Sequence, residues 1–375
     1  MGAPAGALCI GINLYKMTRV EPSSCHGPAR PDTPGGVPAR LRVGVVGAGV
    51  AGLAAARRLA RAGCDVQVFE KSRGPGGRTA TRRSDHGGAF DHGAPSFGAH
   101  DARFVALLAE AEAAGAVARY VPRVAESCHR GIRTREATRQ RWVGVPGMNG
   151  LCRWLAQGLD LHAGARVTRL APTARGVELA CADGGPLGCF DRVLVSVPGP
   201  QAVPLLEAAP ALAARAAALA YEPCFTLMLG LCGPREALPP ALRDHDALRP
   251  SQGPLDWALR VASKPGRASR EAWVLYARAD WSAQRLEGDP EAAGAELLAA
   301  LEAVVGPLPG VVERVPMRWR YARAIPGSAG EPALLDEATG LGLCGDALAG
   351  ARVEAAWRSG EALADAVLRA RGVVA

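Results

Sequence analysis

The residues best suited to chemistry are three glycines with the spacing G-x-G-x-x-G: Gly47, Gly49 and Gly52. They follow an apolar, β-forming segment at residues 43–46. In such a turn the first glycine lets the chain leave a strand sharply, the second brings bare backbone against a pyrophosphate, and the third lets the next helix pack closely. Glu70 ends a second predicted strand about twenty residues further on, where a carboxylate accepts hydrogen bonds from ribose hydroxyls. This order of elements predicts a dinucleotide site rather than an ordinary glycine-rich turn.

Two elements must position this turn. Residues 53–62 have the composition of a helix that ends at Gly63, and residues 66–69 form a second apolar strand. The helix begins directly behind the turn, so its free N–H groups point at the phosphates of the ligand. We therefore expect backbone contacts to the dinucleotide from Val50 and Ala51 as well as from the glycines.

The residues after Glu70 indicate which dinucleotide binds. Lys71 follows the acid, and Gly76, Gly77 and Arg78 come next. This extension resembles the acid-then-G-G-R sequence of many FAD-dependent oxidases and dehydrogenases, among them amine oxidases, protoporphyrinogen oxidases and renalases. Two glycines bring backbone close to the diphosphate, and the arginine offers it a planar fork of donors. The pattern predicts FAD as the cofactor.

The basic charge of the chain has two possible meanings. Of 375 residues, 44 are basic and 36 acidic, and only three of the basic residues are lysines. A nucleic-acid-binding protein would carry a basic stripe with interleaved aromatic residues, whereas here the arginines are scattered and aromatic residues make up 5%. Between Lys71 and Arg83 there are five basic residues and no acid. We interpret this stretch as a lobe facing the phosphates of FAD and of a second nucleotide, rather than as a solvated loop.

Composition sets further limits. With 49% hydrophobic residues, the chain can bury enough apolar surface for two domains. No apolar run is long enough to span a bilayer, and the ten cysteines show neither C-x-x-C pairs nor zinc-like spacing with histidine. We therefore expect no metal site, reduced thiols and a cytoplasmic monomer or homodimer that binds neither membrane nor nucleic acid.

The order of predicted elements gives a domain plan. Residues 1–40 are rich in proline without periodicity, which predicts a disordered lead-in or an over-extended start. The FAD-binding domain is expected to comprise residues 41–100, 143–198 and 310–375, and the substrate domain residues 101–142 and 199–309. Strands that return to the nucleotide sheet are predicted at residues 166–170, 177–181 and 192–197. In this type of fold the first of them passes the adenine, through the backbone of Val167.

The C-terminal part is expected to return to the cofactor. Residues 341–344 form an apolar strand that ends in Gly345 and Asp346, and a long helix follows from Val353. Flavoproteins of this type place such an acid at a ribityl or pyrophosphate-side hydroxyl, and the helix N-terminus over the flavin ring. Arg352 is the candidate for stabilising negative charge on the reduced flavin, the alternative being a surface salt bridge.

Together with the glycine turn, several segments resemble the bacterial renalase-like family of FAD-dependent oxidoreductases, within the amine oxidase and protoporphyrinogen oxidase superfamily. They are residues 90–94, 142–148, 263–267, 280–282 and 318–322, and Gly345-Asp346 with residues 352–354. The resemblance implies an α/β fold like that of p-hydroxybenzoate hydroxylase: a Rossmann-type FAD-binding domain with an inserted mixed α+β substrate domain, and non-covalent FAD. It also implies oxidation of 2- or 6-dihydro isomers of NAD(P)H to NAD(P)+ by hydride transfer to flavin N5, with O2 reduced to hydrogen peroxide.

The substrate pocket is where the chain departs from that family. Pro95-Ser96 stand in place of Gln-Tyr, and Val261 or Ala262 in place of an asparagine. The predicted pocket walls are Pro95, Trp142, Met148, Val261 and Trp281. His92 is interpreted as structural, with flavin contact as the alternative, and His245 as an exposed loop residue.

Hydride transfer from a dihydropyridine needs alignment and exclusion of water, and no acid–base pair, which agrees with the absence of a catalytic triad motif. Two other functions stay open at this point. An amine or porphyrinogen oxidase on the same scaffold would be favoured by an aromatic pair flanking the flavin, which the sequence does not locate. A flavin-binding protein without turnover is the third possibility.

Overall fold

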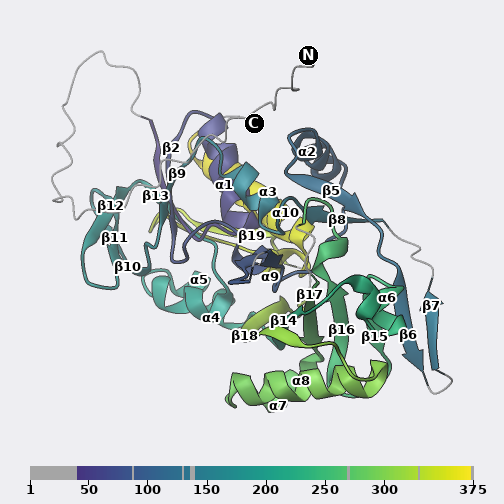
Figure 1. Ribbon diagram of the computed structural model, residues 1–375. Coiled ribbons are helices and arrows are strands. Elements are labelled where there is room, and N and C mark those ends of the chain that lie inside the picture. The colour runs from purple at the N-terminus through teal and green to yellow at the C-terminus, as the bar shows by residue number, and fades with distance from the viewer. Residues whose placement is uncertain are drawn as a thin grey trace, which may run out of the picture.

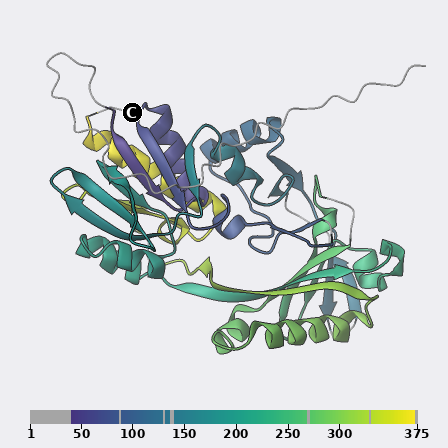
Figure 2. The same cartoon turned by 60° about the vertical axis from the view of Figure 1, so that its left-hand side comes forward.

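The computed structural model describes residues 40–86, 88–128, 131–135, 140–267, 271–327 and 330–372 (Figure 1). The predicted lead-in lies outside this part of the chain, apart from Arg40. Two large sheets dominate the architecture, and the second view shows helices packed on the outer side of each (Figure 2).

A six-stranded sheet holds the glycine turn. Its order is β19-β20-β13-β1-β2-β9, and every neighbouring pair except β19–β20 is parallel. The strands are β1 (Arg42–Val46), β2 (Asp65–Glu70), β9 (Asp160–Ala163), β13 (Arg192–Val195), β19 (Ala333–Asp336) and β20 (Leu341–Cys344). After the arginine that begins each of β1 and β13, these two strands and β20 are continuous apolar runs, because both faces of the sheet are covered.

Two long helices cover one face of this sheet. They are α1 (Val50–Arg61) and α10 (Val353–Ala370), with α3 (Gly150–Leu155) beside them. Gly360 lets α10 approach α1, because a Cβ there would lie 2.1 Å from the carbonyl oxygen of Ala51. α2 (Ala102–Ala113) and the two-stranded sheet of β5 (Val117–Tyr120) and β8 (Arg141–Gly144) extend the same core.

The other face carries a separate three-stranded sheet, β10 (Val167–Thr173), β11 (Gly176–Cys181) and β12 (Pro186–Phe190). α4 (Gly199–Ala202) and α5 (Pro210–Ala217) lie beside it, and Leu206, Leu212 and Ala216 join its apolar core. The prediction that strands near residues 166–170 and 177–181 return to the nucleotide sheet is therefore wrong. They pair antiparallel with each other, and only the third predicted strand, β13, enters the main sheet.

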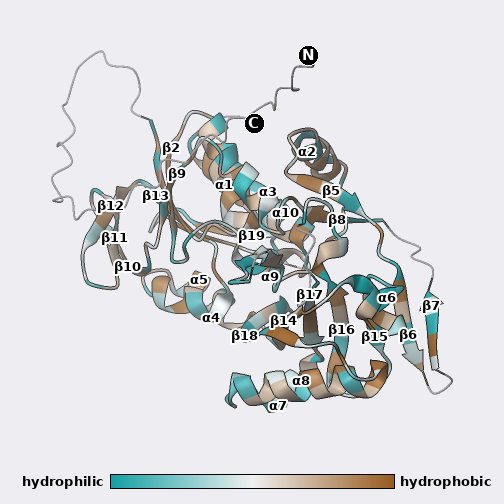
Figure 3. Cartoon of the chain, in the orientation of Figure 1, coloured by the Kyte–Doolittle hydropathy of each residue, from teal (hydrophilic) through white to brown (hydrophobic). Residues whose placement is uncertain are grey.

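A seven-stranded sheet forms the second unit, in the order β18-β14-β17-β16-β15-β6-β7. Its strands are β6 (Val124–Cys128), β7 (Gly131–Arg135), β14 (Tyr221–Leu231), β15 (Ala247–Pro250), β16 (Leu255–Arg260), β17 (Ala272–Ala277) and β18 (Val311–Ala324). The helices α6 (Pro240–Arg243), α7 (Ala279–Gln284) and α8 (Pro290–Val305) accompany it. Hydrophobic residues concentrate in its central strands, whereas β7 is exposed and hydrophilic (Figure 3).

The structure changes the predicted domain boundaries in three places. β18 pairs with β14 along its length, so the segment from residue 310 begins in the second sheet and not in the nucleotide domain. Residues 199–217 pack on the nucleotide side, and so does α2, although both were assigned to the substrate domain. Periodicity marks each of these segments as a strand or helix, but their partners are set by contacts distant in sequence. No helix in the described ranges is long and apolar enough to cross a membrane.

Candidate active site

A single large cavity of about 3050 Å³ receives residues from both sheets. Gly47, Gly49 and Gly77 line it from the nucleotide sheet side, and Tyr276 and Trp319 from the seven-stranded sheet. The predicted nucleotide motif therefore shares one space with the second sheet, as a cofactor beneath a substrate domain requires.

The glycine turn forms the cradle of this cavity. A Cβ added to Gly49 would meet no atom within 4 Å, so this backbone faces open space at the start of α1. A Cβ on Gly77 would lie 3.3 Å from the Cα of Gly49, so the two glycine segments approach closely. Gly47 needs its glycine for a positive φ of 105°. A diphosphate fits such bare backbone at a helix N-terminus, with Val50 and Ala51 also in the wall.

Gly52 serves helix packing and not ligand contact. It does not line the cavity, and a Cβ there would lie 2.1 Å from the carbonyl oxygen of Gly47. Its inclusion among the cofactor contacts is corrected: it permits helix–turn packing, as the motif itself requires.

Glu70 is oriented for a ribose. Its two carboxylate oxygens accept hydrogen bonds from the backbone N–H of Ala48 and of Ser72, each at 2.8 Å. These bonds fix the carboxylate at the cavity wall and leave it lone pairs for hydroxyl donors. Lys71 also lines the cavity, and its Nζ donates to Oε1 of Gln201 at 2.9 Å.

Arg78 and Asp346 are brought together from opposite ends of the chain. Nη1 of Arg78 donates to Oδ2 of Asp346 at 3.0 Å, and its Nη2 donates to Oδ1. The two residues were predicted to contact FAD separately, and their mutual pairing was not foreseen. Both line the cavity, beside Gly77 and Gly345, so the pair closes the cradle between the glycine loop and the end of β20.

The start of α10 also reaches the cavity. Arg352 is the N-cap residue of α10 and Val353 is its first residue, and both line the cavity. Arg352 is exposed and has no ion-pair partner among the described residues, so the alternative of a surface salt bridge finds no support there. Its effect on the reduced flavin stays a prediction.

Three predicted site residues lie elsewhere. Val167 packs in the core under the three-stranded sheet, and Met148 is fully buried in the core around α1. Trp281 packs edge-on against Phe225, with centroids 6.1 Å apart, at the core of the seven-stranded sheet. None of the three lines the cavity, and Met148 and Trp281 belong to apolar cores instead of the predicted pocket wall. The backbone contact of Val167 to adenine stays a prediction. Pro95, Trp142 and Val261 do line the cavity.

Sequence reasoning missed a buried ionic cluster beside the cavity. Oδ2 of Asp91 accepts from Nζ of Lys264 at 3.0 Å and from Nη2 of Arg267 at 2.7 Å. Oδ1 accepts from Oγ1 of Thr81 at 2.8 Å and from the backbone N–H of Met148 at 2.9 Å. Burial raises the pKa of Asp91, but the charges of Lys264 and Arg267 outweigh burial and lower that pKa from 3.8 to about 2. Asp91 therefore stays ionised and joins three distant segments.

His92 follows Asp91 directly in the chain and forms part of the cavity wall. The ring stacks on Trp319, with centroids 5.2 Å apart, and Nε1 of Trp319 donates to the carbonyl oxygen of His92 at 2.8 Å. Burial, with the nearby charge of Arg82, lowers the pKa of His92 from 6.5 to about 4. The ring is neutral at ordinary pH.

This burial predicts an acid sensitivity. Between pH 6.5 and about 4 the unfolded chain protonates His92 while the folded chain does not, so the free energy of unfolding should fall as the pH falls through this window. The full effect is roughly 3 kcal/mol. Urea titrations from pH 7 to pH 4 should show a smaller fall for His92→Phe than for the wild type; equal falls would refute the assignment.

An aromatic pair that the sequence did not reveal also lines the cavity. Tyr221 on β14 and Tyr321 on β18 meet edge-to-face with centroids 5.6 Å apart, and the guanidinium of Arg78 lies 5.8 Å from the Tyr221 ring centroid. No sequence spacing could have shown this pair, because the two tyrosines are joined by strand pairing between β14 and β18.

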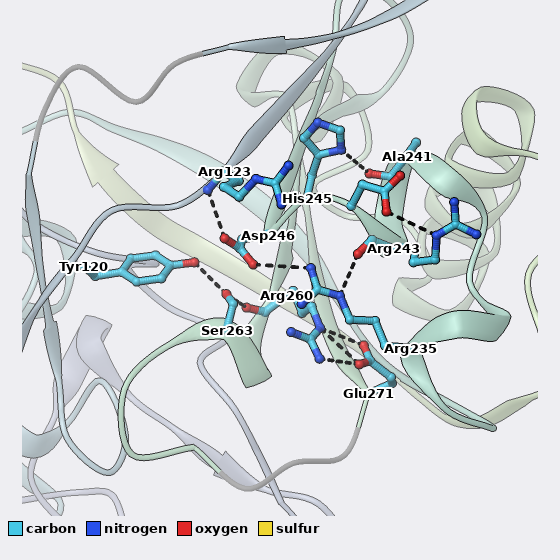
Figure 4. Close-up of polar contacts among 11 residues, drawn as sticks. Tyr120, Arg123, Arg235, Ala241, Arg243, His245, Asp246, Arg260, Ser263 and Glu271 are labelled. Atoms are coloured by element: carbon cyan, nitrogen blue, oxygen red, sulfur yellow. Dashed lines mark hydrogen bonds and ion pairs between the residues drawn. The ribbon is translucent and has the colours of Figure 1, made fainter.

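A second polar cluster lies outside the cavity lining and joins the start of β6, and β7, to the residues just before β15 (Figure 4). Oδ2 of Asp246 accepts from the backbone N–H of Arg123 at 2.9 Å. His245 is buried, with Nδ1 3.0 Å from the carbonyl oxygen of Ala241 and Nε2 2.9 Å from Oγ1 of Thr134. The interpretation of His245 as an exposed loop residue is therefore wrong, because β7 covers it.

The Rossmann-type sheet, the glycine cradle and the ribose acid facing one cavity define a FAD-dependent oxidoreductase. Models of known families agree with this class. A model for an NAD(P)-binding Rossmann-like domain matches residues 45–111, and one for flavin-containing amine oxidoreductases matches residues 116–368. The chain belongs to the flavin-containing amine oxidoreductase family. Its fold class and its FAD cofactor are confirmed.

Individual proteins resemble the chain in a short segment or in the overall fold. A zeta-carotene-forming phytoene desaturase of Myxococcus xanthus is 76% identical over 37 residues, which span 10% of this chain and only 7% of the desaturase. A putrescine oxidase variant has a TM-score of 0.68 at 14% identity, over 88% of this chain and 99% of the other. Cyclohexylamine oxidase from Brevibacterium oxydans IH-35A has a TM-score of 0.68 at 13% identity, over 89% and 100%. At such identities the structures show the fold alone.

Proposed function

We propose that the protein is a renalase-like oxidase that converts 2- or 6-dihydro isomers of NAD(P)H to NAD(P)+, with O2 reduced to hydrogen peroxide. Bound FAD supplies the hydride acceptor in this chemistry. The chain's own residues hold the cofactor through the glycine cradle and Glu70, and shape a second site under the seven-stranded sheet.

The charge of the cavity wall carries this proposal. Basic side chains predominate in it: Lys71, Arg73, Arg78, Arg82, Arg83, Arg119, Arg141, Arg153, Arg267, Arg318, Arg320, Arg323 and Arg352. The acidic side chains there are Glu70, Asp85, Asp160, Glu222, Asp256 and Asp346. Arg82 and Arg83 have no ion-pair partner among the described residues. A cavity wall with this excess of positive charge attracts an anionic dinucleotide and repels a cationic amine.

The aromatic pair supports a second candidate, an amine oxidase. Tyr221 and Tyr321 line the cavity, and an aromatic pair flanking the flavin is the feature that would favour this function. The basic wall argues against it, because an ammonium substrate would have to enter between arginines.

Anaerobic mixing of the yellow holoenzyme with 6-dihydroNAD, 4-dihydroNADH and putrescine separates the two candidates. We expect 6-dihydroNAD to bleach the flavin absorbance rapidly and putrescine to leave it unchanged. Bleaching by the amine, or by none of the three, would overturn the proposal while leaving FAD binding intact.

The basic wall can be tested in the same assay. Arg82→Gln/Arg83→Gln should raise KM for 6-dihydroNAD about tenfold at low salt, because two charges leave the wall. The difference should shrink as salt rises. Arg175→Gln is the matched control, since Arg175 is 84% exposed and outside the cavity.

A further inference from the structure

Two polar atoms in the cavity wall are buried and have no hydrogen-bond partner among the described residues: Nδ1 of His92 and Oγ1 of Thr226. Both residues line the cavity, and each side chain is more than nine-tenths buried. Buried polar atoms without a hydrogen-bond partner are rare in folded proteins, so each one needs a physical explanation. A bound ligand that supplies the missing partners is such an explanation.

The two residues belong to one patch of the wall. Thr226 on β14 pairs across the sheet with Tyr276 of β17 on one side and with Met317 of β18 on the other. Trp319 lies two residues beyond Met317, on the same face of β18, and its ring stacks on His92. His92 and Thr226 therefore both border this face of β18, His92 through Trp319 and Thr226 through Met317.

A further bond fixes the backbone at this patch. The hydroxyl of Tyr276 donates to the carbonyl oxygen of Asp91 at 2.6 Å, directly before His92 in the chain. Nε1 of Trp319 likewise donates a hydrogen bond to the carbonyl oxygen of His92. The position of His92 is thus set from two strands of the seven-stranded sheet.

The surroundings of the patch are apolar. Met228, Val261, Met317 and Tyr276 lie in one hydrophobic cluster, and all four line the cavity. A flat ring can pack on such an apolar surface of thioether, aliphatic and aromatic side chains. A polar substituent on that ring would be directed to the hydroxyl and the imidazole.

The chemistry of the two groups selects the substituent. A hydroxyl both donates and accepts, and a neutral imidazole has one donor and one acceptor nitrogen. His92 is kept neutral by burial and by Arg82, so it does not offer the second donor that a carboxylate would need. An ammonium group would meet the repulsion of Arg82. A neutral carboxamide has both donors and an acceptor.

We propose that Thr226 and His92 form a subsite for a neutral carboxamide on the substrate's ring, which aligns that ring for hydride transfer. This inference rests on the proposed function, since a dihydronicotinamide carries such a group. Both residues act as specificity-determining residues for the ring that reacts.

The test uses the holoenzyme titrated with nicotinamide and with pyridine, which lacks the amide, following the flavin absorbance. Thr226→Val and His92→Phe should each weaken nicotinamide binding five- to tenfold and leave pyridine binding within twofold. Valine keeps the shape of threonine, and phenylalanine keeps the ring that stacks on Trp319. Thr226→Ser should bind nicotinamide like the wild type, and Thr168→Val serves as the control outside the cavity.

Stability provides an independent readout. Thr226→Val should melt no lower than the wild type, because the hydroxyl that it removes has no hydrogen-bond partner in the part of the chain that the structure describes. With 6-dihydroNAD, both variants should raise KM without changing the flavin spectrum of the substrate-free enzyme.

Several results would overturn the subsite: wild-type affinity for nicotinamide in both variants, equal losses for nicotinamide and pyridine, or a changed flavin spectrum without ligand. If 6-dihydroNAD bleaches the wild-type flavin while the variants bind nicotinamide normally, the subsite fails and the proposed function stands. If 6-dihydroNAD does not bleach the flavin but nicotinamide binding still depends on Thr226 and His92, the proposed function fails and the amide subsite stands.

Discussion

Replacing Gly49 by valine is expected to give a folded protein that has lost FAD. Gly49 has φ −81° and extended backbone, which any residue adopts, and an added Cβ meets no protein atom within 4 Å. The side chain would instead occupy the space in front of α1, where the diphosphate must lie against bare backbone. We expect FAD affinity to fall at least about 100-fold, equivalent to roughly 2.7 kcal/mol.

The measurement is the ratio of flavin to protein absorbance after purification, followed by titration of the apoprotein with FAD. Thermal unfolding of the FAD-free protein should be unchanged for Gly49→Val. Gly52→Ala is the contrasting variant, because its Cβ would lie 2.1 Å from the carbonyl oxygen of Gly47 and must shift backbone. It should lose both stability and FAD. A fully yellow Gly49→Val protein would show that the diphosphate lies elsewhere.

The nucleotide-binding turn could be predicted from sequence because its signals are local. The predicted helix at residues 53–62 appears as α1 (Val50–Arg61), and the strand at residues 66–69 as β2 (Asp65–Glu70). Strand, turn, helix and acid are all specified within about thirty residues, so no long-range contact had to be inferred. The placement of Glu70 and of the helix N-terminus follows from the same local order.

The parts that could not be predicted depend on pairs distant in sequence. Arg78 and Asp346 are 268 residues apart, and periodicity gives no sign that they meet. β18 has the alternation of a strand, but nothing in it distinguishes a partner in the second sheet from one in the first. Met148 and Trp281 were assigned to the pocket by residue type, although large apolar side chains more often fill a core.

The two unpartnered atoms of the cavity wall show the same limit. Thr226 carried no motif, because a threonine in an apolar strand is an ordinary β-forming residue. Its significance comes from the face of β14 on which it lies and from the absence of a partner for Oγ1 among the described residues. His92 was noted in a motif, but its neutral state depends on burial, which lowers its pKa, and on the nearby charge of Arg82.

The largest expected effect on stability comes from Asp91→Asn. Lys264 and Arg267, with side chains 1% and 2% exposed, would remain buried without their counter-charge. Breaking a buried ion pair from one side costs about 3–5 kcal/mol, because the remaining charge is desolvated and uncompensated. Asparagine keeps the shape of the side chain and an oxygen that can accept from Thr81 and Met148, so the variant isolates the charge. Urea titration at a fixed excess of FAD measures the loss.

Lys264→Met is the matched variant for this cluster. It removes one cation and leaves Asp91 paired with Arg267 at 2.7 Å, so its free energy of unfolding should fall by less than that of Asp91→Asn. Asp91→Asn/Lys264→Met should regain part of the loss, since only Arg267 is then left uncompensated. A loss below about 1 kcal/mol for Asp91→Asn would mean that water or an anion reaches the two cations. The recovery in the double variant distinguishes a loss of charge balance from a loss of packing, because methionine cannot restore the hydrogen bonds of Asp91 but does remove a buried charge.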